Sequence, residues 1–109
     1  MSTDARSAYD ARAREGPGGE SPLSDSCVLI AEDDAGLRAL VGRRLRRLPV
    51  RTEEASTGRE ALQILHRGEA DLLLLDYRLP DLTASQILDR LDGDDLALPF
   101  IVITGQGDE

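Results

Sequence analysis

Three short aliphatic runs and one more polar segment alternate along the chain with stretches in which leucine recurs at helical spacing. They cover residues 27–31, 50–55, 72–75 and 99–103, of which 50–55 is the polar one. A short, continuous apolar run is typical of a strand buried on both faces. Strands separated by helical patterns indicate parallel strands joined by right-handed crossovers. The sequence therefore predicts an α/β fold in three α/β/α layers, built on an open parallel sheet.

Local capping signals set the expected ends of the three helices. Asp34 is expected to cap the first helix, and Pro49 closes it because the residue before a proline avoids helical geometry. Residues 57–60 fit a capping box that opens the second helix, and Gly68 is expected to end it. A further capping box over residues 83–86 opens the third helix.

Composition separates the first 26 residues from the rest of the 109-residue chain. Residues 1–26 hold scattered apolar side chains among Ser, Gly, Pro and charged residues, and they are predicted to form a disordered leader. Residues 27–109 are predicted to form one domain. The formal net charge of −8 argues against direct binding to nucleic acid and suits a site built from carboxylates. Because no apolar stretch could span a membrane and the N-terminus lacks a secretory signal, we expect a cytoplasmic protein with no membrane partner.

Acidic side chains follow the first and third predicted strands at the point where each strand ends. Glu32, Asp33 and Asp34 follow residues 27–31, and Asp76 follows four leucines. In an open α/β sheet the ligand site lies outside the carboxyl ends of the strands, and neighbouring strands are only about 4.8 Å apart. Carboxylates that converge there repel each other, and oxygen ligands favour a hard cation such as Mg²⁺. The alternative is that the acids cap helices or carry solvated loop charge, which is the interpretation we favour for Asp34.

Four motifs occur in order along the chain: VLIAEDD (28–34), TGREAL (57–62), LLLLDYRLPD (72–81) and PFIVITG (99–105). An acidic pair after the first strand, combined with an aspartate and a Leu-Pro loop after an aliphatic third strand, is a specific arrangement. Together the motifs resemble the receiver domain of bacterial two-component response regulators. The resemblance covers the predicted domain and implies a flavodoxin-like (CheY-like) doubly wound parallel sheet with strand order 2-1-3-4.

The resemblance assigns roles to individual residues. Asp76 would accept a phosphoryl group, and Thr104, which taken alone could be an ordinary strand terminus, would be the switch hydroxyl that bonds it. Mg²⁺ would be held by three acids and one peptide oxygen: Glu32, Asp33, Asp76 and the backbone carbonyl of Arg78. The donor would be a histidine kinase or a phosphotransfer protein, since the chain contains no nucleotide-binding glycine loop. Such a self-catalysed transfer makes the domain a switch and not a turnover enzyme.

The family that the chain resembles continues after the fourth strand with a helix, a fifth strand ending in a lysine, and a fifth helix. None of the 109 residues is a lysine. We therefore expect a receiver domain that lacks its last helix-strand-helix and whose strand-four edge, at residues 99–103, is open to self-association. One alternative function is an interaction module or inactive fragment that is not phosphorylated. A remote alternative is a Mg²⁺-dependent phosphatase of the haloacid-dehalogenase type, although that class has a second aspartate where this chain has Arg78.

Overall fold

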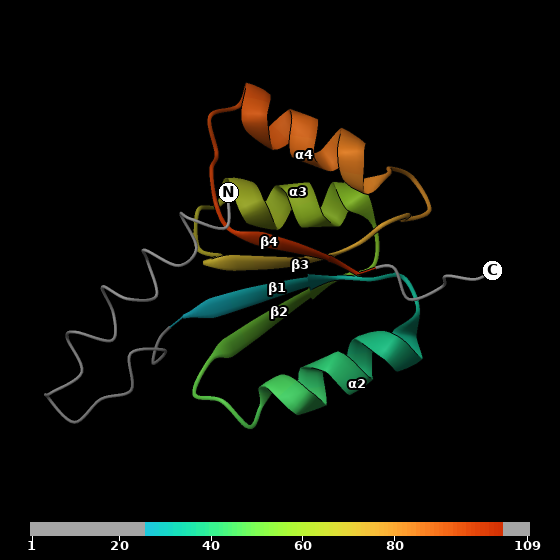
Figure 1. Cartoon of the computed structure of the whole chain (residues 1–109), viewed down its shortest axis with the longest axis vertical. Coiled ribbons are helices and arrows are strands. Elements are labelled where there is room, and N and C mark those ends of the chain that lie inside the picture. Colours follow the sequence, from blue (N-terminus) through green and yellow to red (C-terminus); the bar gives the residue numbers. More distant parts are fainter. Residues whose placement is uncertain (1–25, 104–109) are drawn as a thin grey trace, which may run out of the picture.

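The computed structural model describes residues 26–103 of the chain. Its elements in order are β1 (Cys27–Ala31), α2 (Ala35–Leu45), β2 (Arg51–Ala55), α3 (Gly58–His66), β3 (Leu72–Asp76), α4 (Ala84–Gly93) and β4 (Phe100–Ile103). The strands form one parallel sheet in the order β2-β1-β3-β4, which confirms the predicted order (Figure 1). The predicted leader over residues 1–26, apart from Ser26, lies outside the described residues, as does Thr104.

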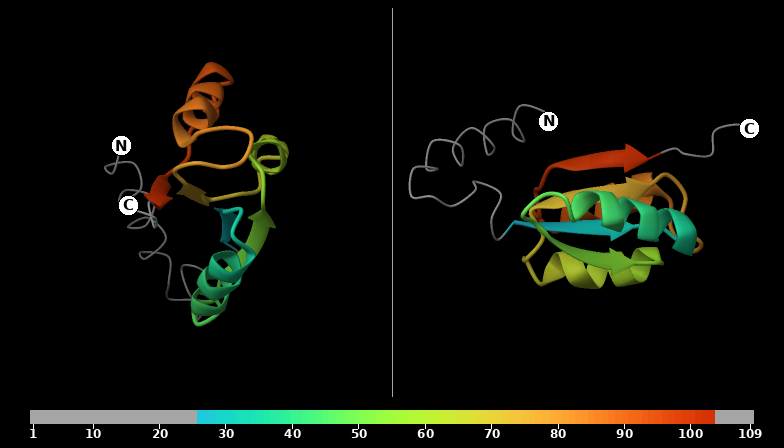
Figure 2. Two further views of the ribbon diagram at one scale, coloured as in Figure 1. Left: turned by 90° about the vertical axis from the view of Figure 1, so that its right-hand side faces the viewer. Right: turned by 90° about the horizontal axis from the view of Figure 1, so that it is seen from below.

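The sheet lies between two helical layers, as the alternation of strands and helices requires. Helix α2 covers one face, over β1 and β2, whereas α3 and α4 cover the opposite face (Figures 1 and 2). This is the doubly wound, flavodoxin-like arrangement expected from the sequence. None of the helices within residues 26–103 is long and apolar enough to span a bilayer.

The closed side of the sheet, defined as the face covered by α3 and α4, holds the main hydrophobic core. Alternate residues of each strand point to opposite faces. Leu29 of β1 and Leu73 and Leu75 of β3 are fully buried in one cluster with Ile87 of α4. Complete burial of such a side chain stabilises the fold by about 1.5–3 kcal/mol. These residues therefore fix the strand positions on which the acidic strand ends depend.

The open side of the sheet, defined as the face that α2 covers within residues 26–103, is less well packed. Ile30 lies beneath Gly42 of α2 and is fully buried. Leu72 and Leu74 of β3 are half-buried, and Ile101 of β4 is 54% exposed. In the described part of the chain, the open side thus leaves apolar strand surface in contact with solvent.

Helix α2 ends at Leu45, earlier than the position of Pro49 predicts. The N–H of Arg47 donates to the carbonyl of Arg44 (3.2 Å), and that of Leu48 donates to the carbonyl of Leu45 (2.9 Å). Bonds of this i→i−3 type tighten the last turn and use carbonyls that have no helical partner. Leu48 is consequently 46% exposed and does not extend the apolar stripe of the helix.

The two predicted capping boxes differ in the structure. At α4 the box is complete, because Thr83 and Gln86 each accept from the backbone N–H of the other. At α3, Thr57 accepts from the N–H of Glu60 (3.1 Å), but the Glu60 carboxylate accepts from the N–H of Ser56 (2.8 Å) instead of that of Thr57. The prediction of where α3 begins is confirmed, and its capping box forms only in part.

Strand β4 has a strand neighbour on its β3 side only, within residues 26–103. Its Phe100 and Ile101 side chains are 43% and 54% exposed. An exposed apolar edge strand favours pairing with another chain, and a lysine on such an edge opposes it. We therefore expect the 109-residue chain to self-associate at high concentration, and Ile101→Lys to shift its sedimentation-average mass toward the 11.8 kDa of one chain.

The matched control for this experiment is Leu48→Lys, which adds the same charge at an exposed apolar side chain outside the sheet. It should leave the association unchanged. If the wild-type chain sediments as a monomer at every concentration tested, association through β4 is ruled out.

Candidate functional site

Glu32 and Asp76 are neighbours because β1 and β3 pair in parallel. Ala31, at the end of β1, is opposite Leu75 of β3, so the next residues along the same register are Glu32 and Asp76. Side chains at matching positions of adjacent parallel strands point to the same face of the sheet. The backbone of Glu32 continues the direction of β1, since its N–H donates to the carbonyl of Ala55 (3.0 Å). The register that builds the sheet therefore places two carboxyl groups side by side.

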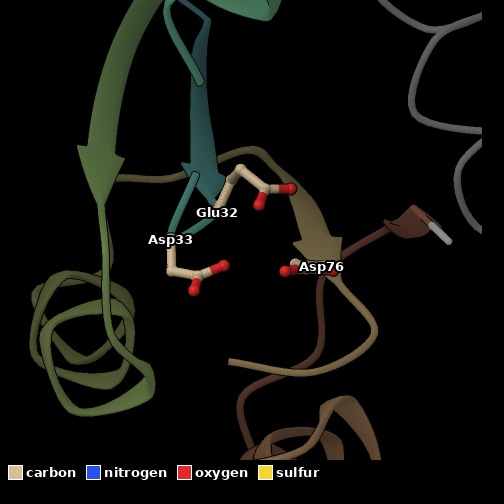
Figure 3. A group of neighbouring side chains, drawn as sticks. All are labelled: Glu32, Asp33 and Asp76. Atoms are coloured by element: carbon tan, nitrogen blue, oxygen red, sulfur yellow. The ribbon is translucent and has the colours of Figure 1, made fainter. Parts of the chain in front are cut away.

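Asp33 completes a group of three carboxylates at this edge, which we call the acidic cluster. Glu32, Asp33 and Asp76 each have a carboxylate oxygen within 4.8 Å of the others. Figure 3 shows the side chains facing a common space at the ends of β1 and β3. Glu32 is buried, Asp76 is half-buried and Asp33 is exposed, so the cluster is reached from solvent on one side. The predicted convergence of these acids is thus seen in the fold.

Burial and mutual repulsion change the protonation of the acidic cluster. The pKa of Glu32 is raised to about 7, chiefly because burial removes its carboxyl group from water, and the negative charges of Asp76 and Asp33 act in the same direction. The pKa of Asp76 is also raised, again chiefly by burial. The two carboxyl groups have oxygens within 4.8 Å of each other, and Glu32, only 4% exposed, is the more buried of the two. Without a cation, the cluster therefore retains a proton near neutral pH.

Two contacts orient Glu32 at the end of β1. The N–H of Asp34 donates to Glu32 Oε2 (3.1 Å), and Nη1 of Arg38 donates to the backbone carbonyl of Glu32 (2.7 Å). Asp34 also caps α2, because its Oδ1 accepts from the N–H of Leu37 (3.0 Å). The interpretation of Asp34 as a cap is confirmed. Nε of Arg38 donates to Glu54 (3.3 Å), so this side chain ties α2 to both β1 and β2.

The loop that follows Asp76 is held by its own backbone hydrogen bonds. The backbone N–H of Arg78 lies near the Asp76 carboxylate and acts against the rise in its pKa that burial causes. Arg78 and Thr83 form an isolated antiparallel bridge, and the N–H of Ala84 donates to the carbonyl of Tyr77 (2.9 Å). The peptide of Arg78, whose carbonyl is a predicted metal ligand, therefore lies in a loop whose two ends are joined.

The structure brings together three of the predicted site residues and leaves one outside its range. The acidic cluster contains Glu32, Asp33 and Asp76, and the Arg78 peptide lies directly beside it. Thr104 is not among the described residues, so its assignment as the switch hydroxyl stays a prediction. Arg38 was missed by sequence reasoning. Its distance of one helical turn from the Asp34 cap is the only local signal, and many surface arginines share such a position.

The acidic cluster can support two kinds of chemistry. Carboxylate oxygens that converge on one point are suited to a hard divalent cation. Asp76, which is half-buried and ends a strand, is also a carboxylate in a fixed position that can act as a nucleophile. Both uses need positive charge to offset the repulsion among the three acids.

Comparison with known proteins identifies relatives of the chain. It matches the family described as the response regulator receiver domain over residues 28–109. It is 35% identical over 78 residues to the regulatory protein LuxO of Vibrio cholerae. The aligned residues make up 72% of this chain and 17% of LuxO. It is 31% identical over 81 residues to sporulation initiation phosphotransferase F of Bacillus subtilis. These residues make up 74% of this chain and 65% of that protein. The chain thus spans a part of each of these relatives.

A solved structure extends the likeness to three dimensions. The non-phosphorylated HemR receiver domain from Leptospira biflexa superposes with a TM-score of 0.67 at 32% identity, covering 77% of this chain and 68% of that one. The family match over residues 28–109 includes the acidic cluster and all of the sheet except Cys27, the first residue of β1. The chain therefore belongs to the response regulator receiver domain family.

Proposed function

We propose that the chain is the phosphoacceptor of a two-component phosphorelay and takes a phosphoryl group at Asp76 in the presence of Mg²⁺. The observation that supports this proposal is the acidic cluster, in which Asp76 lies within reach of two further carboxylates. Like charges brought this close are unfavourable unless a proton or a cation lies between them. The acidic cluster can bind a cation, and the bound cation can then attract an anionic group such as a phosphoryl group.

The donor set of the acidic cluster suits Mg²⁺. Carboxylate and carbonyl oxygens are the ligands that this ion prefers in proteins. Glu32, Asp33 and Asp76 would hold the ion together with the backbone carbonyl of Arg78. When bound, Mg²⁺ supplies positive charge that offsets the negative charge of the phosphoryl oxygens.

The residues of the chain would then carry out an in-line transfer. A carboxylate oxygen of Asp76 attacks phosphorus, and its new P–O bond forms as the P–N bond of a phosphohistidine breaks. The electron pair of the broken bond stays on the imidazole nitrogen of the donor. The backbone N–H of Arg78 lies beside the Asp76 carboxylate, and Thr104 would donate to the transferred group. The product is an acyl phosphate on the chain itself, so the domain undergoes one transfer and is not a turnover enzyme.

The proposed donor is a histidine kinase or a phosphotransfer protein in the cytoplasm. The Bacillus subtilis relative is named a phosphotransferase, which supports a place in a chain of phosphoryl transfers. The net charge of −8 gives no support to a direct nucleic-acid partner. The choice of kinase would depend on how well the surface of this chain fits the surface of the kinase.

The main competing function is an interaction module that is never phosphorylated. The 109 residues contain no lysine, so the experiment has to show whether this chain is phosphorylated. Phosphoramidate, whose P–N bond matches that of phosphohistidine, separates the two functions when it is added with Mg²⁺. A phosphoacceptor gains one phosphoryl group that hydroxylamine removes, whereas an interaction module gains none. A phosphatase would instead release phosphate continuously.

Asp76→Asn should abolish phosphorylation and weaken Mg²⁺ binding. The substitution removes the nucleophilic oxygen and one of the three carboxylates, so we expect the Kd for Mg²⁺ to rise by about tenfold or more. Intact-mass spectrometry after treatment with phosphoramidate measures the first effect, and calorimetric titration measures the second. Asp89→Asn, at an exposed carboxylate of α4, is the matched control and should change neither. Wild-type Mg²⁺ affinity in Asp76→Asn would contradict the site.

Glu32 should make the metal-free chain less stable as the pH rises. Its pKa is about 7 in the fold and 4.5 in the reference state, so the folded chain binds this proton more tightly than the unfolded chain. The resulting stability is fully present below pH 4.5 and is lost as the pH rises through about 7. We therefore expect Glu32→Gln to be more stable than the wild type at pH 8 by about 1–3 kcal/mol, and close to it at pH 5.

Urea unfolding in the presence of a chelator measures this difference in free energy at both pH values. Saturating Mg²⁺ should restore the wild-type stability at pH 8, because ligand binding to the folded state adds to its free energy of unfolding. Saturating Mg²⁺ should raise the free energy of unfolding of Glu32→Gln by less than it raises that of the wild type. If the variant and the wild type respond to pH in the same way, Glu32 does not hold the proton.

A further inference from the structure

The N-terminus of α3 is bound by a side chain from the loop that follows the phosphoacceptor. Oδ1 of Asp81 accepts from the N–H of Gly58 (2.7 Å), and Oδ2 accepts from the N–H of Arg59 (3.0 Å). The next amide, that of Glu60, is taken by Thr57, the helix's own cap. The first three amides of α3 are thus satisfied, two of them by a carboxylate 22 and 23 residues away in the sequence.

The contact between Asp81 and α3 is electrostatically favourable. The N-terminal end of a helix carries partial positive charge, and hydrogen bonds from its amides to a carboxylate are stronger than those to a neutral acceptor. These bonds lower the pKa of Asp81, with the bond from Gly58 as the main cause. Asp81 is therefore ionised at neutral pH.

A second contact presses the same loop against α3. A Cβ atom on Gly58 would lie 2.8 Å from Cβ and Cδ1 of Leu82, closer than real Cβ contacts come. Because one of these atoms is next to the loop backbone, the loop itself would have to move. Gly58 thus permits a close approach between α3 and Leu82, beside the hydrogen bonds of Asp81.

The tethered loop is continuous with the proposed phosphorylation site. The N–H of Leu79 donates to the carbonyl of Leu82 (3.0 Å), and Arg78 bridges to Thr83. The backbone N–H of Arg78 in turn lies near the Asp76 carboxylate and acts against the rise in its pKa that burial causes. Internal bonds of this kind make the loop move as a unit, so a displacement at its Asp81 end reaches the Arg78 peptide.

We propose that Asp81 is a positioning residue, which holds the Arg78 peptide in place for Mg²⁺ and for Asp76 by fastening the loop to the N-terminus of α3. The inference rests on the proposed function and extends it to a residue that does not touch the reacting atoms. Residues that orient a metal ligand from outside the coordination sphere commonly change metal affinity or activity by about 10- to 100-fold when they are replaced. We expect an effect at the lower end of that range, because the affected ligand is a peptide and not a side chain.

The test uses the 109-residue chain with Mg²⁺ alone and with phosphoramidate. Asp81→Ala, which removes both hydrogen bonds, should raise the Kd for Mg²⁺ by about tenfold and slow phosphorylation of Asp76 to a similar degree at low Mg²⁺. Saturating Mg²⁺ should recover much of the rate. Asp81→Asn keeps one acceptor oxygen, so its Kd should lie between those of the wild type and Asp81→Ala.

Two variants of α3 separate positioning from stability. Thr57→Ala removes the helix's own cap, at a typical cost of about 1 kcal/mol, and leaves the Asp81 contact in place. It should lower the unfolding midpoint without changing the Kd for Mg²⁺. Gly58→Ala improves the helix propensity of α3 but forces the loop away from it. It should weaken Mg²⁺ binding as Asp81→Ala does, which a simple loss of helix stability would not explain.

The outcomes distinguish the inference from the proposed function. If the wild type binds Mg²⁺ and is phosphorylated while Asp81→Ala matches it in both, the positioning role of Asp81 is overturned and the proposed function stands. If Thr57→Ala weakens Mg²⁺ binding as much as Asp81→Ala, the effect is one of stability and the inference is again overturned. A wild-type chain that neither binds Mg²⁺ nor is phosphorylated overturns both.

Discussion

The parallel register between β1 and β3 is the constraint on which both the core and the acidic cluster depend. Val28 is opposite Leu72, and the pairing continues to Ala31 and Leu75. A slip of one residue would turn every side chain of a strand to the other face of the sheet. Such a slip would expose the buried leucines of β3 and would also carry Asp76 away from the end of β1. The sheet therefore cannot lose its acidic cluster by a change of register without losing its core.

The acidic cluster is unfavourable by itself, and the aliphatic strands supply the stability that keeps it together. Burial raises the pKa of Glu32 to about 7, so the fold accepts an ionisable group where its charge is poorly solvated. The four consecutive leucines of β3 lie directly before Asp76 and anchor it. A cluster that is held rigidly and lacks its counter-charge is poised to bind a cation or a proton. The charge repulsion that lowers the stability of the metal-free fold thus favours the binding of a cation.

Features set by short stretches of sequence and by the topology of parallel strands could be predicted, and individual side-chain contacts between distant segments could not. The strands follow from runs of apolar residues, and the acids were located by the rule that ligand sites lie at the carboxyl ends of parallel strands. The end of α2 was misjudged because hydrogen bonding in its last turn, and not Pro49, decides where it stops. The bonds of Arg38 to Glu54 and of Asp81 to Gly58 join residues 16 and 23 positions apart, and no spacing in the sequence signals them.

The two sides of the sheet are packed unequally, and the site contacts both of them. The loop after Asp76 lies on the closed side, and the Asp76 side chain lies on the open side. The loop after Asp76 is anchored on the closed side, where Leu79 is buried in the main core cluster. The Asp76 side chain itself alternates with Leu75 and so points to the open side, where Leu74 is only half-buried. A close-packed core resists displacement, whereas regions with few buried contacts open at lower free energy. Within residues 26–103, the Asp76 side chain therefore lies on the less densely packed side of the sheet, while the loop that follows it is held by α3 and by the main core.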